Sequence, residues 1–276
     1  MTTMPGRLSD RIAVVTGGAR GIGHAIAQRL SAEGATCVIA DIDGAAAAET
    51  ATTLGGLAVP TDISSSAAVN ALRDTVLEQF GRVDIVVNNA GIHLQKLVVD
   101  MSDAEWDAVQ QTNARGCFFV CRAFAPALMR QESGRIINII TKLGAGNPYS
   151  SAYIASKSAV FGFTQCLANE LAAYGVTVNA VAPGHIGPGT GLEKWFFMKA
   201  ELMGLSWEEF ERNVLKSIPM GRWCRPDDVA AAVAYLASDE ASFITAETIN
   251  VTGGWSGYGS PPPRQPQAQL GAEGAL

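Results

Sequence analysis

A tyrosine and a lysine four residues apart, Tyr153 and Lys157, stand at the start of a segment with helical periodicity. This spacing puts the phenol and the ammonium on one face of a helix, one turn apart. A nearby positive charge lowers the pKa of a tyrosine, which predicts a general base for alcohol oxidation and a general acid for ketone reduction. Amphipathic helices of many kinds carry this spacing, so the pair indicates proton transfer only in combination with a second binding site.

A glycine-rich turn supplies that second site. It reads Thr16-Gly-Gly-Ala-Arg-Gly-Ile-Gly23, follows the first apolar run and opens the first helical pattern. Glycines here let backbone N–H groups and a helix N-terminus approach a pyrophosphate. A purely structural turn is the alternative, but the context on both sides favours nucleotide binding. The contacts are expected from Gly17, Arg20, Gly21, Ile22 and Gly23.

An acidic residue, Asp41, ends the second apolar run, with Ile42 after it. A carboxylate at this point accepts hydrogen bonds from the adenosine ribose and repels a 2′-phosphate, which favours NAD over NADP. Asp41 could instead serve only as a turn or cap residue, and Arg20 could offer a contact to a phosphate. Further cofactor contacts are expected after the third and fourth runs, although ordinary turn chemistry explains these residues as well. They are Asp62, Ile63, Asn89, Ala90 and Gly91.

Apolar runs alternate with helical patterns along the chain, which predicts βαβ units and a parallel sheet. We expect one α/β domain over residues 1–258, a doubly wound Rossmann fold of about seven parallel strands with helices on both faces. Strands are expected at 12–16, 36–40, 56–60, 83–87, 135–140, 176–181 and 248–251, and helices at 22–33, 67–80, 103–130, 151–174 and 227–237. Residues 185–217 interrupt the alternation and are expected to form a lid, and the proline-rich residues 259–276 a flexible tail.

The composition restricts the partners. The 276 residues carry a formal net charge of −6, which argues against nucleic acid and anionic membranes and favours a small-molecule substrate. The chain shows no apolar signal or membrane-spanning segment, so the cytoplasm is the expected compartment. The five cysteines are scattered, and only Cys117 and Cys121 lie close enough in sequence to share a helix face. They are interpreted as reduced core residues, with no metal site expected.

Taken together, these motifs resemble the short-chain dehydrogenase/reductase family over about residues 8–256. The resemblance rests on the glycine turn at 16–23, Asn88-Asn-Ala-Gly91, Asn113, Tyr153-x-x-x-Lys157 and Pro183-Gly184. It implies that Tyr153 is the catalytic acid and base and that Lys157 also holds the nicotinamide ribose. It further implies that Asn113 binds a water that relays protons to solvent. Alternatively, Asn113 is a helix residue whose side chain only bonds to the backbone. Pro183, Gly184 and Ile186 would contact the nicotinamide, and the helices at 103–130 and 151–174 would form a homotetramer.

The sequence departs from the family pattern at two places. A serine that binds the substrate oxygen usually ends the fifth strand, and here the pair is Ile140-Thr141. Thr141 keeps a hydroxyl and is assigned this role, with Ser150 and Ser151 as alternatives. The family commonly has a threonine soon after Pro183-Gly184, and whether Thr190 reaches the nicotinamide is left open.

The expected function is hydride transfer between NAD(H) and a secondary alcohol or ketone. The segments 221–229 and 247–255 are similar to those of family members acting on polyols and diols, whereas the aromatic lid suits a cyclic alcohol equally well. Candidate substrate contacts are His93, Leu143, Tyr149 and Trp195. Two alternatives remain: an NADPH-dependent carbonyl reductase, and a catalytically weak NAD-binding protein that acts as a sensor or assembles with partners.

Overall fold

Seven parallel strands form the centre of the computed structural model. The structure describes residues 6–143, 148–188 and 193–255; for residues 193–195 it describes the backbone alone. The strand order across the sheet is β3-β2-β1-β4-β5-β6-β7. The strands are β1 (Ile12–Thr16), β2 (Thr36–Asp41), β3 (Leu57–Pro60), β4 (Ile85–Asn88), β5 (Gly134–Ile139), β6 (Val176–Pro183) and β7 (Thr248–Val251). The predicted parallel sheet and its single α/β domain are confirmed.

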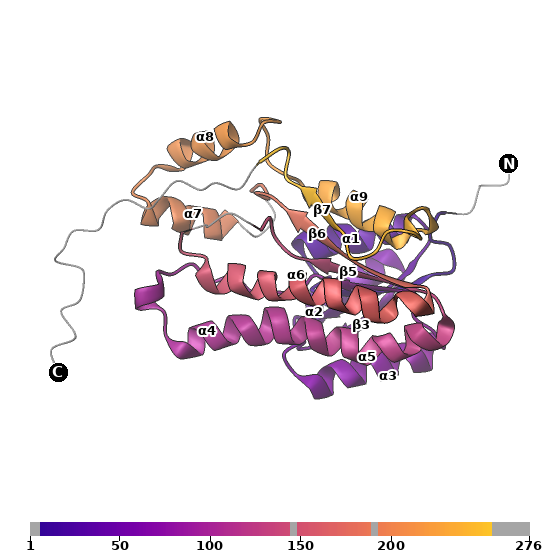
Figure 1. Cartoon of the computed structure of the whole chain (residues 1–276). Helices are drawn as coiled ribbons and strands as arrows, with labels where there is room; N and C mark the ends of the chain where they lie inside the picture. The colour runs from indigo at the N-terminus through magenta and orange to yellow at the C-terminus, as the bar shows by residue number, and fades with distance from the viewer. Residues whose placement is uncertain (1–5, 144–147, 189–192, 256–276) are drawn as a thin grey trace.

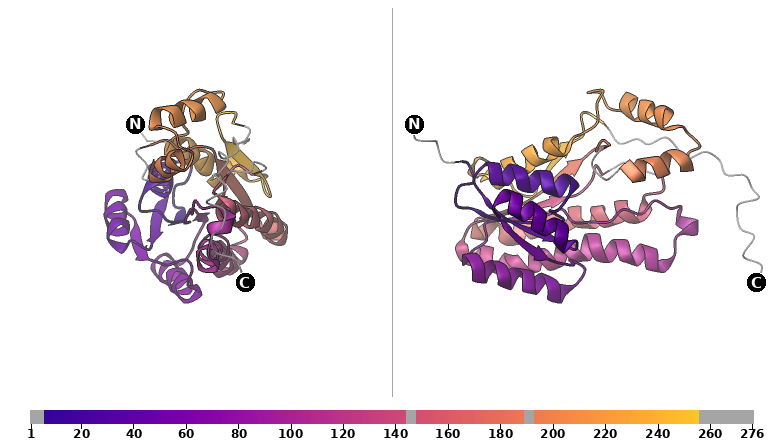
Figure 2. Two further views of the ribbon diagram at one scale, coloured as in Figure 1. Left: turned by 90° about the vertical axis from the view of Figure 1, so that its left-hand side faces the viewer. Right: turned by 180° about the vertical axis from the view of Figure 1, so that it is seen from behind.

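Helices cover both faces of the sheet (Figures 1 and 2). One face carries α1, α2 and α9, and the other carries α3, α5 and α6, with α4 packed against α6. The helices are α1 (Gly21–Ala32), α2 (Gly44–Leu54), α3 (Ser66–Phe80), α4 (Asp103–Gln110), α5 (Gly116–Gln131), α6 (Ser151–Leu171), α7 (Glu193–Leu202), α8 (Trp207–Ser217) and α9 (Pro226–Ala237).

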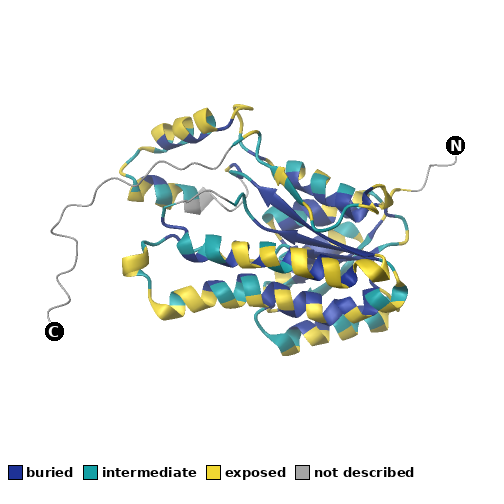
Figure 3. Ribbon diagram, in the orientation of Figure 1, coloured by how far each residue is buried: buried dark blue, intermediate teal, exposed yellow. Residues whose placement is uncertain are grey.

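Alternate side chains of each strand enter two separate cores. Val14 and Val86 pack with α3, α5 and α6, whereas Val15 and Val87 pack with α1, α2 and α9. Since both faces of the sheet are covered, the five central strands are buried on both sides, whereas the edge strands β3 and β7 are only partly buried; Figure 3 colours the strands by burial. This double burial explains why the strands are continuous apolar runs in the sequence and not alternating ones.

Two helical segments differ from the prediction. The alanine-rich run Gly44–Leu54 forms α2, which the sequence analysis did not predict; Asp43 caps it by accepting from Ala46 N at 3.0 Å. The predicted helix at 103–130 is helical throughout, but a π-helical turn at Gln111–Arg115 lies within it, between α4 and α5. A π turn accommodates one extra residue and changes the direction in which its side chains point.

The predicted lid consists of α7 and α8, which lie beyond the carboxyl ends of the strands (Figure 1). Its aromatic residues build a small core of their own: Phe210 is buried, and the rings of Phe196 and Trp223 lie 5.1 Å apart. Trp207 stacks parallel to Trp223 at 6.3 Å. The side chain of Trp195, residue Thr190 and the predicted tail at 259–276 lie outside the described residues.

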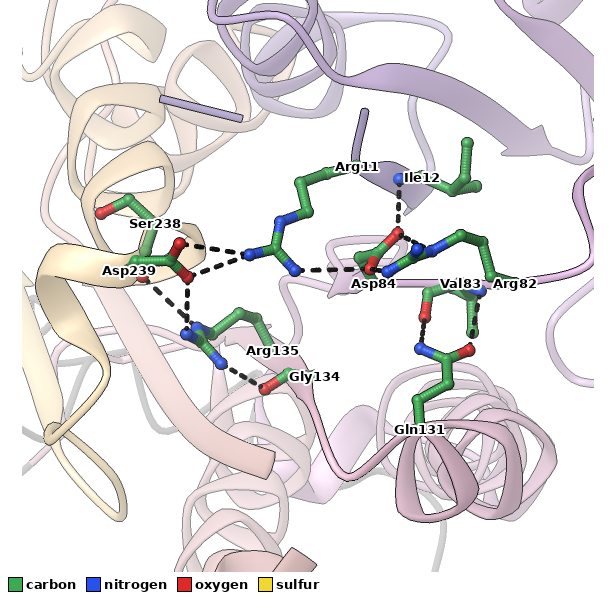
Figure 4. Close-up of polar contacts among 10 residues, drawn as sticks. All are labelled: Arg11, Ile12, Arg82, Val83, Asp84, Gln131, Gly134, Arg135, Ser238 and Asp239. Atoms are coloured by element: carbon green, nitrogen blue, oxygen red, sulfur yellow. Dashed lines mark hydrogen bonds and ion pairs between the residues drawn. The ribbon is translucent and has the colours of Figure 1, made fainter. Parts of the chain in front are cut away.

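A network of charged groups ties together the opposite, amino-terminal ends of the strands (Figure 4). Asp84, which is 2% exposed, accepts from Ile12 N at 2.9 Å and pairs with Arg82 and Arg11. Arg11 continues to Asp239, which also pairs with Arg135. The network therefore joins the amino-terminal ends of β1, β4 and β5 to the turn after α9.

Within the part of the chain that the structure describes, no helix has both the length and the apolar character needed to cross a membrane. The same residues include no cluster of three or more histidine, cysteine or acidic side chains suited to hold a metal ion.

We predict that Asp84→Ala lowers the free energy of unfolding by about 3 kcal/mol, because it leaves two arginines and a backbone amide without their shared acceptor. Urea denaturation measures the change. Asp74→Ala is the control, since Asp74 forms an exposed pair with Arg73 and its loss is expected to cost less than about 1 kcal/mol. Equal losses in the two variants would contradict a structural role for the network.

Candidate active site

The strand order places an open crevice at the carboxyl ends of β1 and β4. The chain leaves β1 toward β2 on one side and later returns to β4 on the other, so the connections diverge at this point. Thr16, Ala90, Asn113 and Lys157 line the hollow between them. Parallel sheets of this class bind their ligands at such a position.

The turns after β1 and β4 are bonded directly to each other. The hydroxyl of Thr16 accepts from Asn89 N at 3.0 Å and from Ala90 N at 3.2 Å. The side chain of Asn89 donates to Thr16 O and Gly17 O, each at 3.0 Å. Asn89 therefore holds the glycine turn in place, a positioning role in addition to the cofactor contact that the sequence predicts.

The glycine turn leaves no room for side chains. A Cβ at Gly23 would lie 2.0 Å from Gly17 O, and one at Gly17, which has φ +61°, would lie 2.8 Å from Ala90 Cα. The backbone at Arg20, Gly21 and Ile22 then begins α1, whose first N–H groups are open to an anion. This bare cradle at a helix N-terminus fits the pyrophosphate of a dinucleotide.

Asp41 lies at the end of β2 beside this turn. Its carboxylate accepts from Ala19 N at 3.1 Å and from Asp43 N at 3.0 Å, which fixes its orientation. Each carboxylate oxygen has a second lone pair, so both can still accept from a ribose hydroxyl. Arg20 pairs with Asp43 at 2.7 Å. The expected contact to ribose remains a prediction that this geometry permits.

The cofactor contacts expected after β2 and β3 differ in their surroundings. Ile42 is 75% exposed at the rim, and Asp62 accepts from Ser64 N and Ser64 Oγ in a local turn. Ile63 is buried and its side chain packs where a Cβ of Gly116 would collide with it. The side chain of Ile63 thus belongs to the core, and only its backbone remains available to a cofactor.

Asn113 is buried in the π-helical turn and clamps the chain after β4. Its Oδ1 accepts from Ile92 N at 2.8 Å, and its Nδ2 donates to Ile92 O at 2.9 Å and to Ser156 Oγ at 3.0 Å. The same segment includes Gly91, where a Cβ would lie 3.0 Å from Asn113 Oδ1. The sequence analysis gave a helix asparagine bonded to backbone as the alternative to a water-binding role. Asn113 does bond to backbone, but to Ile92 in the segment after β4 and not to its own helix. Its part in a proton relay remains a prediction.

Lys157 is buried at the floor of the crevice, and its ammonium donates to Ile139 O at 2.7 Å. Burial lowers its pKa to about 8, opposed by the nearby Cys117. Tyr153 lies one turn earlier on α6, with its ring centre 5.8 Å from Lys157 Nζ. The helix thus brings the two predicted residues together on one face.

The pKa of Tyr153 is not lowered by this lysine. Burial raises it to about 12. The expectation of a lowered tyrosine pKa is therefore wrong for the chain by itself. The reason is that desolvation disfavours the phenolate more than the ammonium, held by the Ile139 carbonyl, stabilises it.

The substrate candidates occupy different places. Thr141 follows β5 and is half-buried, and Leu143 packs against the core on the α5–α6 face. Tyr149 is buried with φ +67°, and its Oη lies 3.4 Å from Leu202 O of α7. Tyr149 thus contacts the lid. The roles of Thr141 and Leu143 toward a substrate remain predictions.

His93 lies directly against the catalytic tyrosine, with the ring centres 4.3 Å apart. Its Nε2 lies 3.1 Å from Ser150 Oγ, so this hydroxyl at the start of α6 contacts the imidazole and makes no cap hydrogen bond. Burial lowers the pKa of His93 to about 4, helped by the charges of Lys199 and Lys157. The imidazole is therefore neutral at pH 7.

The segment after β6 forms the far wall. Gly184 N donates to Val251 O, and Cys224 bridges the chain through His185 O and Gly187 N. In a parallel bridge of this kind the N–H and C=O of the central residue, Ile186, point away from Cys224. Pro183 ends β6 immediately before this turn. His185, to which the sequence analysis assigned no role, also belongs here, with its ring centre 4.3 Å from that of Trp255.

A bare phosphate cradle, an acidic residue at the end of β2 and a half-buried tyrosine one helical turn from a buried lysine define a dinucleotide-binding oxidoreductase. The comparisons agree: residues 17–256 match the family model described as enoyl-(acyl carrier protein) reductase. The chain belongs to the short-chain dehydrogenase/reductase family. It is accordingly an enzyme, an oxidoreductase that binds a nicotinamide cofactor.

Similar proteins carry reductase and dehydrogenase names. The 3-oxoacyl-[acyl-carrier-protein] reductase of Haemophilus influenzae is 37% identical over 250 residues, which cover 90% of this chain and 98% of that one. A short-chain reductase of Streptomyces niveus is 38% identical over 250 residues, covering 89% and 94%. The crystal structure of a protein of Sinorhizobium meliloti named as a short-chain alcohol dehydrogenase has a TM-score of 0.82 and 32% identity, covering 90% and 97%.

We predict that Lys157→Met changes the pH dependence of stability. The lysine pKa of about 8 in the folded chain lies below its unfolded value, so its destabilising effect is complete below pH 8. It disappears as the pH rises from 8 toward 10.5. The wild type should therefore gain on the order of 3 kcal/mol relative to the variant across this range.

Urea denaturation of both proteins between pH 7 and pH 10 measures the difference. The variant lacks the hydrogen bond to Ile139 O at every pH. This loss therefore does not contribute to the pH dependence of the difference in unfolding free energy between the two proteins. A difference that stays constant with pH would show that Lys157 is not desolvated in solution.

Proposed function

We propose that this enzyme transfers a hydride between NAD(H) and the carbon of a secondary alcohol or ketone. The observation that supports this most directly is the position of Tyr153, half-buried against His93 and one helical turn from Lys157. When bound, the nicotinamide supplies or accepts the hydride. The substrate classes first expected are polyols, diols and cyclic alcohols.

The chain's own residues handle the proton. With a pKa of about 12, Tyr153 is protonated at neutral pH and suited to donate from Oη to a carbonyl oxygen. Thr141 offers a hydroxyl to the same oxygen. In the oxidation direction the base is the phenolate of Tyr153, whose negative charge the ammonium of Lys157 stabilises; its Oη takes the alcohol proton and the tyrosine becomes neutral. The tie between Asn113 and Ile92 holds the neighbouring wall of the site.

The proposed preference for NAD rests on Asp41, which two backbone amides hold beside the cradle. A negative charge there opposes a 2′-phosphate. An NADPH-dependent carbonyl reductase is the second candidate, because similar proteins are named as reductases and Arg20, although paired with Asp43, is largely exposed. Binding of the two cofactors separates these candidates.

We expect purified protein to form NADH from at least one secondary alcohol in a panel of polyols, diols, cyclic alcohols and hydroxysteroids. Tyr153→Phe should lower kcat by at least about 100-fold while the dissociation constant of NAD stays within twofold, because only the proton donor is removed. Asp41→Ala should reduce the preference for NAD over NADP by at least about tenfold.

Three outcomes would contradict parts of this proposal. Full activity in Tyr153→Phe would remove the tyrosine from the mechanism. Tighter binding of NADPH than of NADH by the wild type would favour the carbonyl reductase. Binding of NAD without turnover of any alcohol or ketone would favour a sensor or assembly protein.

We also propose a homotetramer built through α5 and α6. Phe118 on α5 is 39% exposed, lies edge-on to Phe163 of α6 and is covered by the guanidinium of Arg122 at 4.8 Å. Such an exposed aromatic cluster suits an interface between copies. Light scattering should give four times 28.9 kDa, and Phe118→Glu should give a smaller species. A monomeric wild type would overturn the proposal.

A further inference from the structure

A hydrogen-bonded chain connects α6 to the segment after β4 through one buried serine. Ser156 lies in α6 between Tyr153 and Lys157 and is fully buried. Its Oγ donates to Tyr153 O at 2.7 Å and accepts from Asn113 Nδ2 at 3.0 Å. Serines often bond to a carbonyl of their own helix, so the first bond alone says little. The second bond crosses to the π-helical turn and therefore joins two elements.

Asn113 extends this connection to Ile92. Its Nδ2 has two hydrogens, one for Ser156 Oγ and one for Ile92 O at 2.9 Å, and its Oδ1 accepts from Ile92 N at 2.8 Å. Because the hydroxyl hydrogen of Ser156 is engaged with its own helix, the serine offers Asn113 only an acceptor. The amide group is therefore fixed with Nδ2 toward the serine and Oδ1 toward the backbone amide.

His93, the residue after Ile92, closes a circuit of contacts. Its ring centre lies 4.3 Å from that of Tyr153, and its Nε2 lies 3.1 Å from Ser150 Oγ at the start of α6. The circuit thus begins at the backbone of Tyr153, passes through the buried serine, and returns to the phenol ring of the same residue.

This circuit lies beside the groups expected to transfer the proton. A Cβ at Gly91 would lie 3.0 Å from Asn113 Oδ1 and 3.5 Å from Lys157 Nζ, so the segment after β4 passes close to both. Figure 1 shows α4 and α5, which flank the π-helical turn, running beside α6. A small displacement of this segment would therefore change the direction of the phenol of Tyr153.

We propose that Ser156 is a positioning residue of the proposed reaction. Acting through Asn113 and residues 92–93, it holds the phenol of Tyr153 in the direction that proton transfer requires. The inference rests on the proposed function and adds a residue to it. Loss of the hydroxyl leaves one Nδ2 hydrogen of Asn113 buried without an acceptor, which favours displacement of the amide. A misplacement on the order of 1 Å can lower turnover about 100-fold.

The first test separates turnover from binding. Ser156→Ala should lower kcat by at least about tenfold for the best substrate of the panel, while KM and the dissociation constant of NAD stay within threefold. The solvent deuterium isotope effect on kcat should rise, because the proton step slows relative to the hydride step. Alanine favours helices, so α6 is expected to form in the variant. An unchanged kcat, or a loss confined to KM, overturns the inference.

Three further variants control for packing. Gln110→Ala removes another bond to the same turn of α6, from Gln110 Nε2 to Ala152 O at 3.0 Å, but leaves the circuit intact. Ser158→Ala changes an exposed serine of α6, and both variants should keep kcat within threefold of the wild type. Ser156→Cys keeps a weaker donor and acceptor and should give an intermediate kcat. A loss in Gln110→Ala as large as that in Ser156→Ala would show that general packing explains the effect and would overturn the inference.

A double-mutant cycle tests the route. The effect of Ser156 on the phenol is proposed to pass through the ring of His93, so the losses in kcat from the two sites should be non-additive. We expect Ser156→Ala to lower kcat less than threefold in a His93→Ala background. Losses that multiply would show that the serine acts by another route, which contradicts the proposal.

A spectroscopic measurement separates failure of this inference from failure of the proposed function. The five tyrosines are replaced by meta-fluorotyrosine, and the fluorine NMR resonance of Tyr153 is assigned from its absence in Tyr153→Phe. Ser156→Ala and His93→Ala should both shift this resonance and leave those of Tyr174 and Tyr235 in place. Such a shift supports the inference even if no substrate turns over, in which case the proposed function alone fails. An unmoved Tyr153 resonance overturns the inference and leaves the hydride transfer standing.

Discussion

The turns after β1 and β4 must share a space too narrow for side chains, and the rest of the site depends on this constraint. Thr16 and Asn89 bond the two turns together, and a Cβ at Gly23 would overlap Gly17 O. Because the strand order reverses here, the crevice opens at this point, and the first turn of α1 faces it with unpaired N–H groups. Cofactor binding is thus a consequence of how two loops pack.

Stability and chemistry are concentrated at opposite ends of the sheet. At the amino-terminal end, Asp84 and its arginines satisfy one another's charges. At the carboxyl end, desolvation disfavours the charged forms of Lys157 and Tyr153, and shifted pKa values of this kind are common among groups that transfer protons.

The lid has a degree of structural independence. Phe210 and Val214 belong to a small core separate from the two that flank the sheet. The lid contacts the body through a few side chains, among them Phe196 against His185. A pair of helices with its own core can change in sequence with little effect on the packing of α6.

The sequence by itself determined the parallel sheet, the glycine turn and the pairing of Tyr153 with Lys157, since periodicity and helical spacing are properties of neighbours along the chain. It did not predict α2 or the π turn that directs Asn113 toward Ile92. It also predicted the wrong direction for the pKa of Tyr153, because desolvation depends on how distant segments cover a side chain. Only the tertiary structure brought His93 against Tyr153, because the segment after β4 and the start of α6 are far apart in sequence and meet at one end of the sheet.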